Sequence, residues 1–141
     1  LYAMECILVD LLTQKGLKPD AVAGHSLGEY VALYAAGAFD FETGLQLVKR
    51  RAELMDLASE GKMTALLGFD REQLTAAIAE TEGVVLANDN SAAQVVISGT
   101  AEAIAAVVGK IKVKKAIPLN VSGAFHSPMM AAAAASASLA P

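Results

Sequence analysis

A serine between two glycines is the residue of this sequence best suited to do chemistry. Ser26 stands in a Gly-x-Ser-x-Gly pattern over residues 24–28, which follows the short apolar stretch 21–23 and precedes an alanine-rich helical pattern. A strand that turns sharply into a helix in this way forms a nucleophile elbow, which exposes the serine hydroxyl. We therefore predict a strand over 21–23 and a nucleophile at Ser26.

The neighbours of this serine have predicted roles of their own. We expect that no side chain would fit at Gly24 or Gly28, because strand and helix approach each other closely at an elbow. Leu27 follows the serine at the start of the helix, where backbone amides have no acceptor within the helix. Its N–H is predicted to be one donor of an oxyanion hole.

A serine nucleophile needs a base, and the sequence has two histidines. His25 is adjacent to Ser26, where neighbouring side chains diverge, so it is poorly placed to take the serine proton. His126 remains, in the small-residue loop 120–128, and loops often carry catalytic side chains. We predict that His126 is the general base, with a structural loop histidine as the alternative.

Arg51 is a charged residue on an apolar helix face. It lies three or four residues from Leu47 and Leu54, whereas Arg50 points elsewhere. A buried guanidinium must find an anion or extend to solvent. Two interpretations stay open: a structural salt bridge with an acidic residue, or binding of a substrate carboxylate beside Ser26, for which the planar guanidinium is well shaped.

Hydrophobic periodicity predicts an α/β fold, with an opening helix packed on a sheet. The sequence from Gly61 onward has the order β-α-β-β-α-β, which is that of a ferredoxin-like unit. We predict this small subdomain over 61–118, inserted into a hydrolase-like parallel-sheet core formed by 1–60 and 119–141. The expected helices cover 1–15, 27–36, 41–58, 70–82 and 100–112, and the expected strands of the insert cover 62–67, 84–87, 94–98 and 115–119.

Two segments are predicted to carry no chemistry. Residues 88–91 (Asn-Asp-Asn-Ser) are interpreted as a hairpin turn, since they lack the spaced oxygen ligands and closing Glu of a calcium loop. The tail 131–140 is almost all alanine and serine, and we assign it no function. We also expect the sequence to be truncated at both ends.

Composition excludes several classes of function. The 141 residues are 55% hydrophobic, which suits one globular domain with a small insertion. No apolar run is long enough to span a membrane and no secretory leader opens the chain, so we predict no membrane partner and a cytoplasmic location, with a plastid as an alternative.

Cys6 has no partner for an internal disulfide. No metal or cofactor is expected, because ligand pairs and phosphate loops are lacking.

Three motifs, with Arg51 between the first two, resemble the malonyl-CoA:acyl carrier protein transacylase family. They are Gly-His-Ser-Leu-Gly-Glu-Tyr over 24–30, Gln-Val-Val-Ile-Ser-Gly over 94–99 and Gly-Ala-Phe-His-Ser over 123–127. The resemblance implies a ping-pong transfer, in which Ser26 attacks the malonyl thioester. It implies that His126 accepts the serine proton and that Arg51 holds the malonyl carboxylate.

The resemblance also bears on substrate and partners. Leu27 and the Ala-Phe-His sequence at 124–126 resemble the malonyl-selective type rather than the methyl-branched type. The implied partners are malonyl-CoA as substrate and an acidic carrier protein in fatty acid or polyketide synthesis. The local basic cluster Lys110, Lys112, Lys114 and Lys115 is either its contact surface or simply a solvated lysine face. The net charge of −4 indicates no nucleic-acid partner, and a monomer is compatible with the sequence.

Departures from the family pattern keep alternatives open. The glutamine segment that completes the family's oxyanion hole is not among these residues, nor is the segment whose carbonyl orients the histidine. A chain limited to these residues would be weakly active or inactive. The alternatives are a serine hydrolase or thioesterase with the same elbow, and a non-catalytic fragment of a synthase.

Overall fold

The computed structural model describes residues 1–58 and 60–137, which form two compact units. The first unit is Leu1–Glu53, and the second begins at Leu54 and includes the rest of the described chain. The two units are built differently, because the first is helical and the second contains the sheet.

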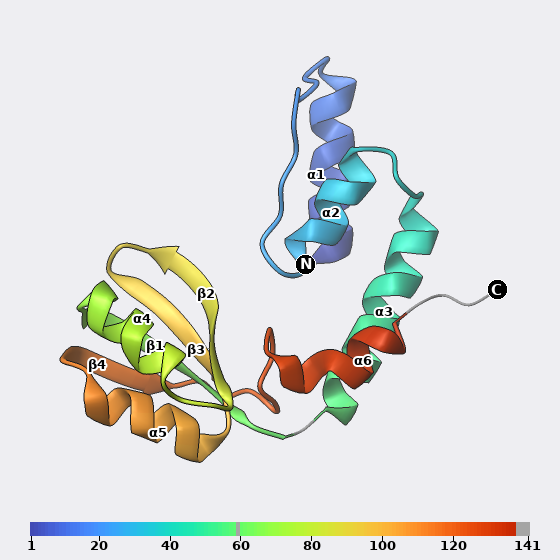
Figure 1. Cartoon of the computed structure of the whole chain (residues 1–141). Coiled ribbons are helices and arrows are strands. Elements are labelled where there is room, and N and C mark those ends of the chain that lie inside the picture. Colours follow the sequence, from blue (N-terminus) through green and yellow to red (C-terminus); the bar gives the residue numbers. More distant parts are fainter. Residues whose placement is uncertain (59, 138–141) are drawn as a thin grey trace. The chain divides into compact units, whose positions relative to one another are not determined.

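The first unit contains α1 (Tyr2–Gln14), α2 (Gly28–Ala35) and most of α3 (Phe41–Leu57). Figure 1 shows α1 and α2 side by side, with the connecting segment running back along α1. A glycine with positive φ follows each of α1 and α2: φ is 79° at Gly16 and 73° at Gly37, as expected for residues that end a helix. These three helices lie where the sequence predicts them, within two residues at each end.

The strand predicted over 21–23 is wrong. These residues have no regular secondary structure, and every strand of the described residues belongs to the sheet of the second unit. A strand requires hydrogen bonds to a neighbouring strand, and residues 21–23 have none. For the same reason α1 packs against α2 rather than on a sheet, and several of its large apolar side chains are about half exposed: Met4, Ile7, Leu8, Leu11 and Leu12.

The second unit has the predicted element order β-α-β-β-α-β. Its strands are β1 (Lys62–Phe69), β2 (Val84–Ser91), β3 (Gln94–Gly99) and β4 (Val113–Pro118), and its helices α4 (Arg71–Ala79) and α5 (Ala101–Lys110). The strands form one sheet in the order β2-β3-β1-β4, with every neighbouring pair antiparallel.

Helices α4 and α5 cover one face of this sheet (Figure 1). The core between them contains fully buried Leu66, Val95, Ile97 and Val107. Both helices begin at side-chain caps: Asp70 accepts from the Gln73 N–H at 2.9 Å and Thr100 from the Ala103 N–H at 3.1 Å. Each cap stabilises its helix by about 1 kcal/mol.

The other face of the sheet is covered by the loop that follows β4. Met63, Ala65 and Val96 are buried there, and Leu119, Val121 and Phe125 pack against them. Because Phe125 is held by the sheet, the next residue, His126, starts from a fixed backbone position.

The hairpin turn predicted at 88–91 lies three residues later, at 91–94. Strand β2 continues to Ser91, and the chain reverses at residues 92–93. Two register shifts, between Leu86 and Asn88 and between Asp89 and Ser91, accommodate these polar residues within the strand as bulges. Arg71 donates to both Asp89 carboxylate oxygens, at 2.8 and 2.9 Å, which lowers the pKa of that carboxyl.

The first part of the alanine-rich tail is helical. A 3-10 turn, η1 (Pro128–Met130), leads into the short helix α6 (Ala131–Ala135), consistent with the high helix propensity of alanine. Residues 138–141 lie outside the described residues.

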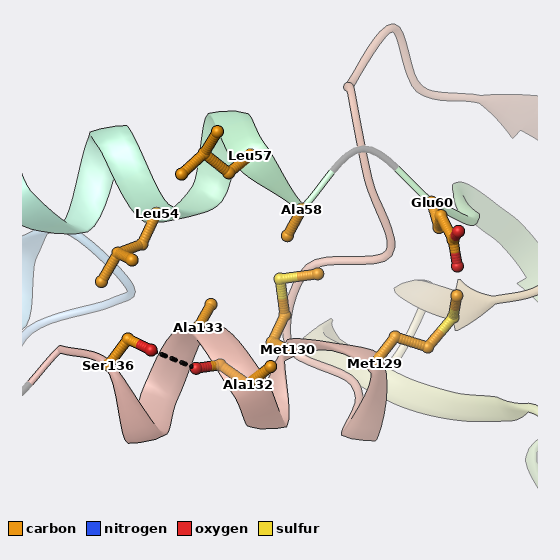
Figure 2. Close-up of a pocket in the computed structure, with 9 residues that line it drawn as sticks. All are labelled: Leu54, Leu57, Ala58, Glu60, Met129, Met130, Ala132, Ala133 and Ser136. Carbon is orange, nitrogen blue, oxygen red and sulfur yellow. Dashed lines mark hydrogen bonds between the residues drawn. The ribbon is translucent and has the colours of Figure 1, made fainter.

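A pocket of about 500 Å³ separates α6 from the end of α3. Figure 2 shows Ala133 and Met130 on one side facing Leu54 and Ala58 on the other. Its lining is mainly apolar and contains none of the predicted site residues.

Across the described residues, no helix combines the length and the apolar character needed to cross a membrane.

Candidate functional site

Ser26 has the backbone of a strained turn. Its φ of 53° is in the left-handed region, which a residue with a side chain adopts at a cost of about 1–3 kcal/mol. The turn is closed by hydrogen bonds from the Gly28 N–H to the His25 carbonyl at 2.9 Å and from the Glu29 N–H to the Ser26 carbonyl at 3.2 Å. Helix α2 begins two residues after the serine. This is the local geometry of a nucleophile elbow, without the predicted strand before it.

The two glycines of the motif are not equivalent. A Cβ on Gly24 would overlap the backbone of Gly28 and Glu29, so the expectation for Gly24 is confirmed. A Cβ on Gly28 would meet nothing within 4 Å, so the expectation for Gly28 is wrong. The reason is that Gly28 borders an open groove of about 420 Å³ between α1, α2 and residues 21–24.

Replacing Gly24 with Ala is expected to destabilise the protein by about 1–3 kcal/mol, because the added methyl group overlaps backbone that cannot move independently. Gly28→Ala is the matched control, and its expected effect is within about 1 kcal/mol because the position opens to space and lies in a helix. Denaturant unfolding of both variants measures the difference. Equal losses at the two positions would contradict this account of the elbow.

Arg51 lies next to Ser26. Its Nη2 donates to the Ser26 Oγ at 2.9 Å, and the guanidinium lies over the Tyr30 ring, with its Cζ 6.0 Å from the ring centroid. Within the part of the chain that the structure describes, Arg51 forms no ion pair with a carboxylate. The salt bridge considered from the sequence is therefore absent there, and the half-buried guanidinium is turned toward the serine.

Leu27 is half-buried and has helical backbone angles, φ −57° and ψ −34°, at the N-cap of α2. Its amide directly follows Ser26 and precedes the first helical turn, where backbone N–H groups have no acceptor within the helix. The position suits an oxyanion donor, which stays a prediction.

His126 belongs to the second unit, in the loop after β4. Its φ is 58°, so it is the second residue other than glycine with left-handed backbone among those described. The loop is fixed on both sides of it: the Ala124 N–H donates to the Glu60 carbonyl at 2.9 Å, and the Ser127 hydroxyl donates to the Ala124 carbonyl at 2.6 Å. The histidine side chain is exposed, as is that of His25 in the first unit.

The predicted basic cluster is partly neutralised. Lys110 lies 3.6 Å from the Glu80 carboxylate, and the aliphatic part of the Lys114 side chain covers Gly68. Lys112, Lys114 and Lys115 are exposed. A carrier-protein contact at this cluster stays a prediction.

Tyr30 is a site residue that reasoning from the sequence did not identify. Tyr30 lies in α2 four residues after Ser26, and this spacing was the one sequence feature that could have pointed to it. Only the tertiary structure places Arg51 over its ring. As for metals, no group of three or more potential ligands occurs among residues 1–58 and 60–137.

Comparison with known proteins agrees with this geometry. The chain is 61% identical, over 93% of its length, to the malonyl CoA-acyl carrier protein transacylase of Synechocystis sp., and covers 45% of that protein. The crystal structure of the Synechocystis enzyme superimposes with a TM-score of 0.91 at 59% identity, over 96% of this chain and 46% of that one.

A second solved structure is a type II polyketide synthase acyl-carrier protein in complex with its malonyl-transacylase. This chain resembles it with a TM-score of 0.85 at 36% identity, over 96% of this chain and 47% of that one. The chain thus spans about half the length of the relatives that it matches. The acyl transferase domain family matches residues 1–140. The chain therefore belongs to the acyl transferase domain family.

Proposed function

We propose that the protein containing this chain transfers a malonyl group from coenzyme A to the thiol of an acyl carrier protein, through a malonyl-Ser26 intermediate. The reaction serves fatty acid or polyketide synthesis and requires no metal or other cofactor. The names of the similar proteins, which are malonyl transacylases, support the substrate and the carrier.

One observation carries the proposal: the Arg51 Nη2 lies 2.9 Å from the Ser26 Oγ. A guanidinium has five N–H donors, so four remain for other acceptors while one contacts the serine. A carboxylate bound to them would bring a malonyl thioester close to the nucleophile. A hydrolase acting on uncharged acyl groups gains nothing from such a cation, so the transferase is favoured over the serine hydrolase or thioesterase.

The other groups have the following roles in the proposal. His126 takes the proton of the Ser26 hydroxyl as the serine attacks the thioester carbon, and coenzyme A leaves as its thiol. The Leu27 N–H stabilises the tetrahedral oxyanion. In the second half-reaction His126 takes the proton of the carrier thiol, the new thioester forms as the Ser26 ester bond breaks, and His126 returns the proton to the Ser26 Oγ.

The proposal includes a fold assignment. The β-α-β-β-α-β sheet of residues 61–118 is a ferredoxin-like subdomain, and residues 1–60 and 119–141 belong to a hydrolase-like catalytic subdomain. The antiparallel order β2-β3-β1-β4 supports the first part. The left-handed backbone of Ser26 before α2 supports the second.

Incubation of the full-length protein with labelled malonyl-CoA tests the proposal. We expect a malonyl adduct that maps to Ser26 by peptide mass spectrometry, persists in buffer and is discharged by a carrier-protein thiol. Rapid release of malonate to water would instead indicate a hydrolase. The absence of any adduct would indicate a non-catalytic scaffold.

A further inference from the structure

We propose that Tyr30 is a positioning residue, which holds the Arg51 guanidinium in the orientation that selects a carboxylate-bearing acyl group. The assignment rests on the proposed function, because it concerns how the same site recognises malonyl. It adds a residue whose side chain has no role in the acyl transfer itself.

The geometry places Tyr30 on one side of Arg51 and the nucleophile on another. Tyr30 is the third residue of α2 and is half-buried, and the Arg51 Cζ lies 6.0 Å from the centroid of its ring. The same guanidinium donates from Nη2 to the Ser26 Oγ at 2.9 Å. All three residues lie in the first unit, so the arrangement is internal to one compact body.

An aromatic ring is well suited to this task. The negative face of a ring attracts a cation without using any of its N–H donors. A carboxylate partner would hold Arg51 equally well, but it would occupy the donors and the charge that the substrate needs. Arg51 has no carboxylate partner among the described residues, and its guanidinium contacts the ring of Tyr30 and the hydroxyl of Ser26.

The consequence is specific to acyl groups that carry a carboxylate. A long arginine side chain that is not restrained must lose rotational freedom when it binds its ligand, which weakens binding. Loss of the ring should therefore raise the half-saturating concentration of malonyl-CoA. It should leave the maximal rate of acylation and the acylation by acetyl-CoA nearly unchanged, because neither depends on a fixed guanidinium.

Single-turnover acylation of Ser26 in the full-length protein tests the assignment, with malonyl-CoA and acetyl-CoA varied separately. Tyr30→Leu is expected to raise the half-saturating malonyl-CoA concentration about 3- to 10-fold, which lies within the range of a half-buried cation–π contact. Tyr30→Phe keeps the ring and should restore the value to within about twofold of the original. Tyr30→Met is a second ring-free variant, because methionine fills irregular space.

Tyr34→Leu is the matched control. Tyr34 lies one turn later in the same helix and its hydroxyl donates to Asp10 at 2.7 Å, so the variant also loses an aromatic ring and a hydrogen bond, but away from Arg51. We expect its half-saturating malonyl-CoA concentration to stay within about twofold of the original.

The outcomes separate this assignment from the proposed function. If Tyr30→Leu and Tyr30→Met form the malonyl adduct with an unchanged half-saturating malonyl-CoA concentration, the role of Tyr30 is overturned and the proposed function is not. Equal losses in Tyr30→Phe and Tyr30→Leu, or equal losses for malonyl-CoA and acetyl-CoA, also overturn it. The absence of a malonyl adduct on the unsubstituted protein overturns the proposed function, and this assignment with it.

Discussion

Replacing His126 with Ala is expected to lower the rate of malonyl loading on Ser26 about 1000-fold, because a positioned general base contributes roughly 10²–10⁴-fold to such a step. The serine hydroxyl would then have to lose its proton to water as it attacks the thioester. Both half-reactions should slow, since the proposed mechanism has the same histidine take the proton of the carrier thiol. Single-turnover loading with labelled malonyl-CoA, followed by discharge to the carrier, measures the two steps.

His25→Ala is the matched control, because His25 is the other histidine and is adjacent to the nucleophile. Its expected loss is less than about tenfold, as for a residue that does not transfer the proton. Ser26→Ala gives the background without a nucleophile. A loss in His25→Ala as large as that in His126→Ala would contradict the choice of base.

The loop around His126 should keep its conformation in the His126→Ala variant. Phe125 packs on the sheet, and the Ser127 hydroxyl donates to the Ala124 carbonyl, so the loop on both sides of His126 is held by residues that the substitution leaves in place. Thermal unfolding of the variant should therefore resemble that of the unsubstituted protein. The loss of rate then reports on the imidazole rather than on the loop.

Replacing Arg51 with Ala is expected to lower kcat/KM for malonyl-CoA about 100-fold, which corresponds to about 2.7 kcal/mol of lost transition-state stabilisation. The substrate carboxylate would lose its charge-assisted hydrogen bonds on leaving water. Acetyl-CoA has no such carboxylate, so its kcat/KM should change far less. The ratio of the two values is the measurement, and it should fall by about as much as the malonyl value.

Two further variants sharpen this test. Arg50→Ala removes the neighbouring arginine, which faces solvent and lies 3.7 Å from Glu53, and should change the ratio by less than about twofold. Arg51→Lys keeps the charge but loses the planar fork, so we expect an intermediate loss. Unchanged selectivity in Arg51→Ala would refute the carboxylate-binding role, whatever the effect on rate.

The local backbone of the candidate site could be predicted largely from nearby residues. The Gly-x-Ser-x-Gly pattern identified Ser26, and the structure gives this residue the left-handed backbone of an elbow. The helices predicted from residues 70 and 100 begin there, at Asp70 and Thr100, because a side-chain cap depends only on residues three positions apart.

Features that depend on distant segments could not be predicted in the same way. The stretch 21–23 has the composition of a strand, but a strand exists only where another strand pairs with it. The polar residues 88–91 suggested a turn, whereas pairing with β3 keeps them in a bulged strand. Gly28 has the sequence position of an obligatory glycine, yet open space adjoins it.

The sequence by itself determined which residues can react: a serine set for an elbow, a histidine in a loop and an arginine on an apolar helix face. These properties follow from residue type and near neighbours. Only the tertiary structure decided where the Arg51 guanidinium lies, because 25 residues separate it from Ser26 along the chain. The same long-range packing placed the Tyr30 ring beside the guanidinium, and no periodicity in the sequence encodes that contact.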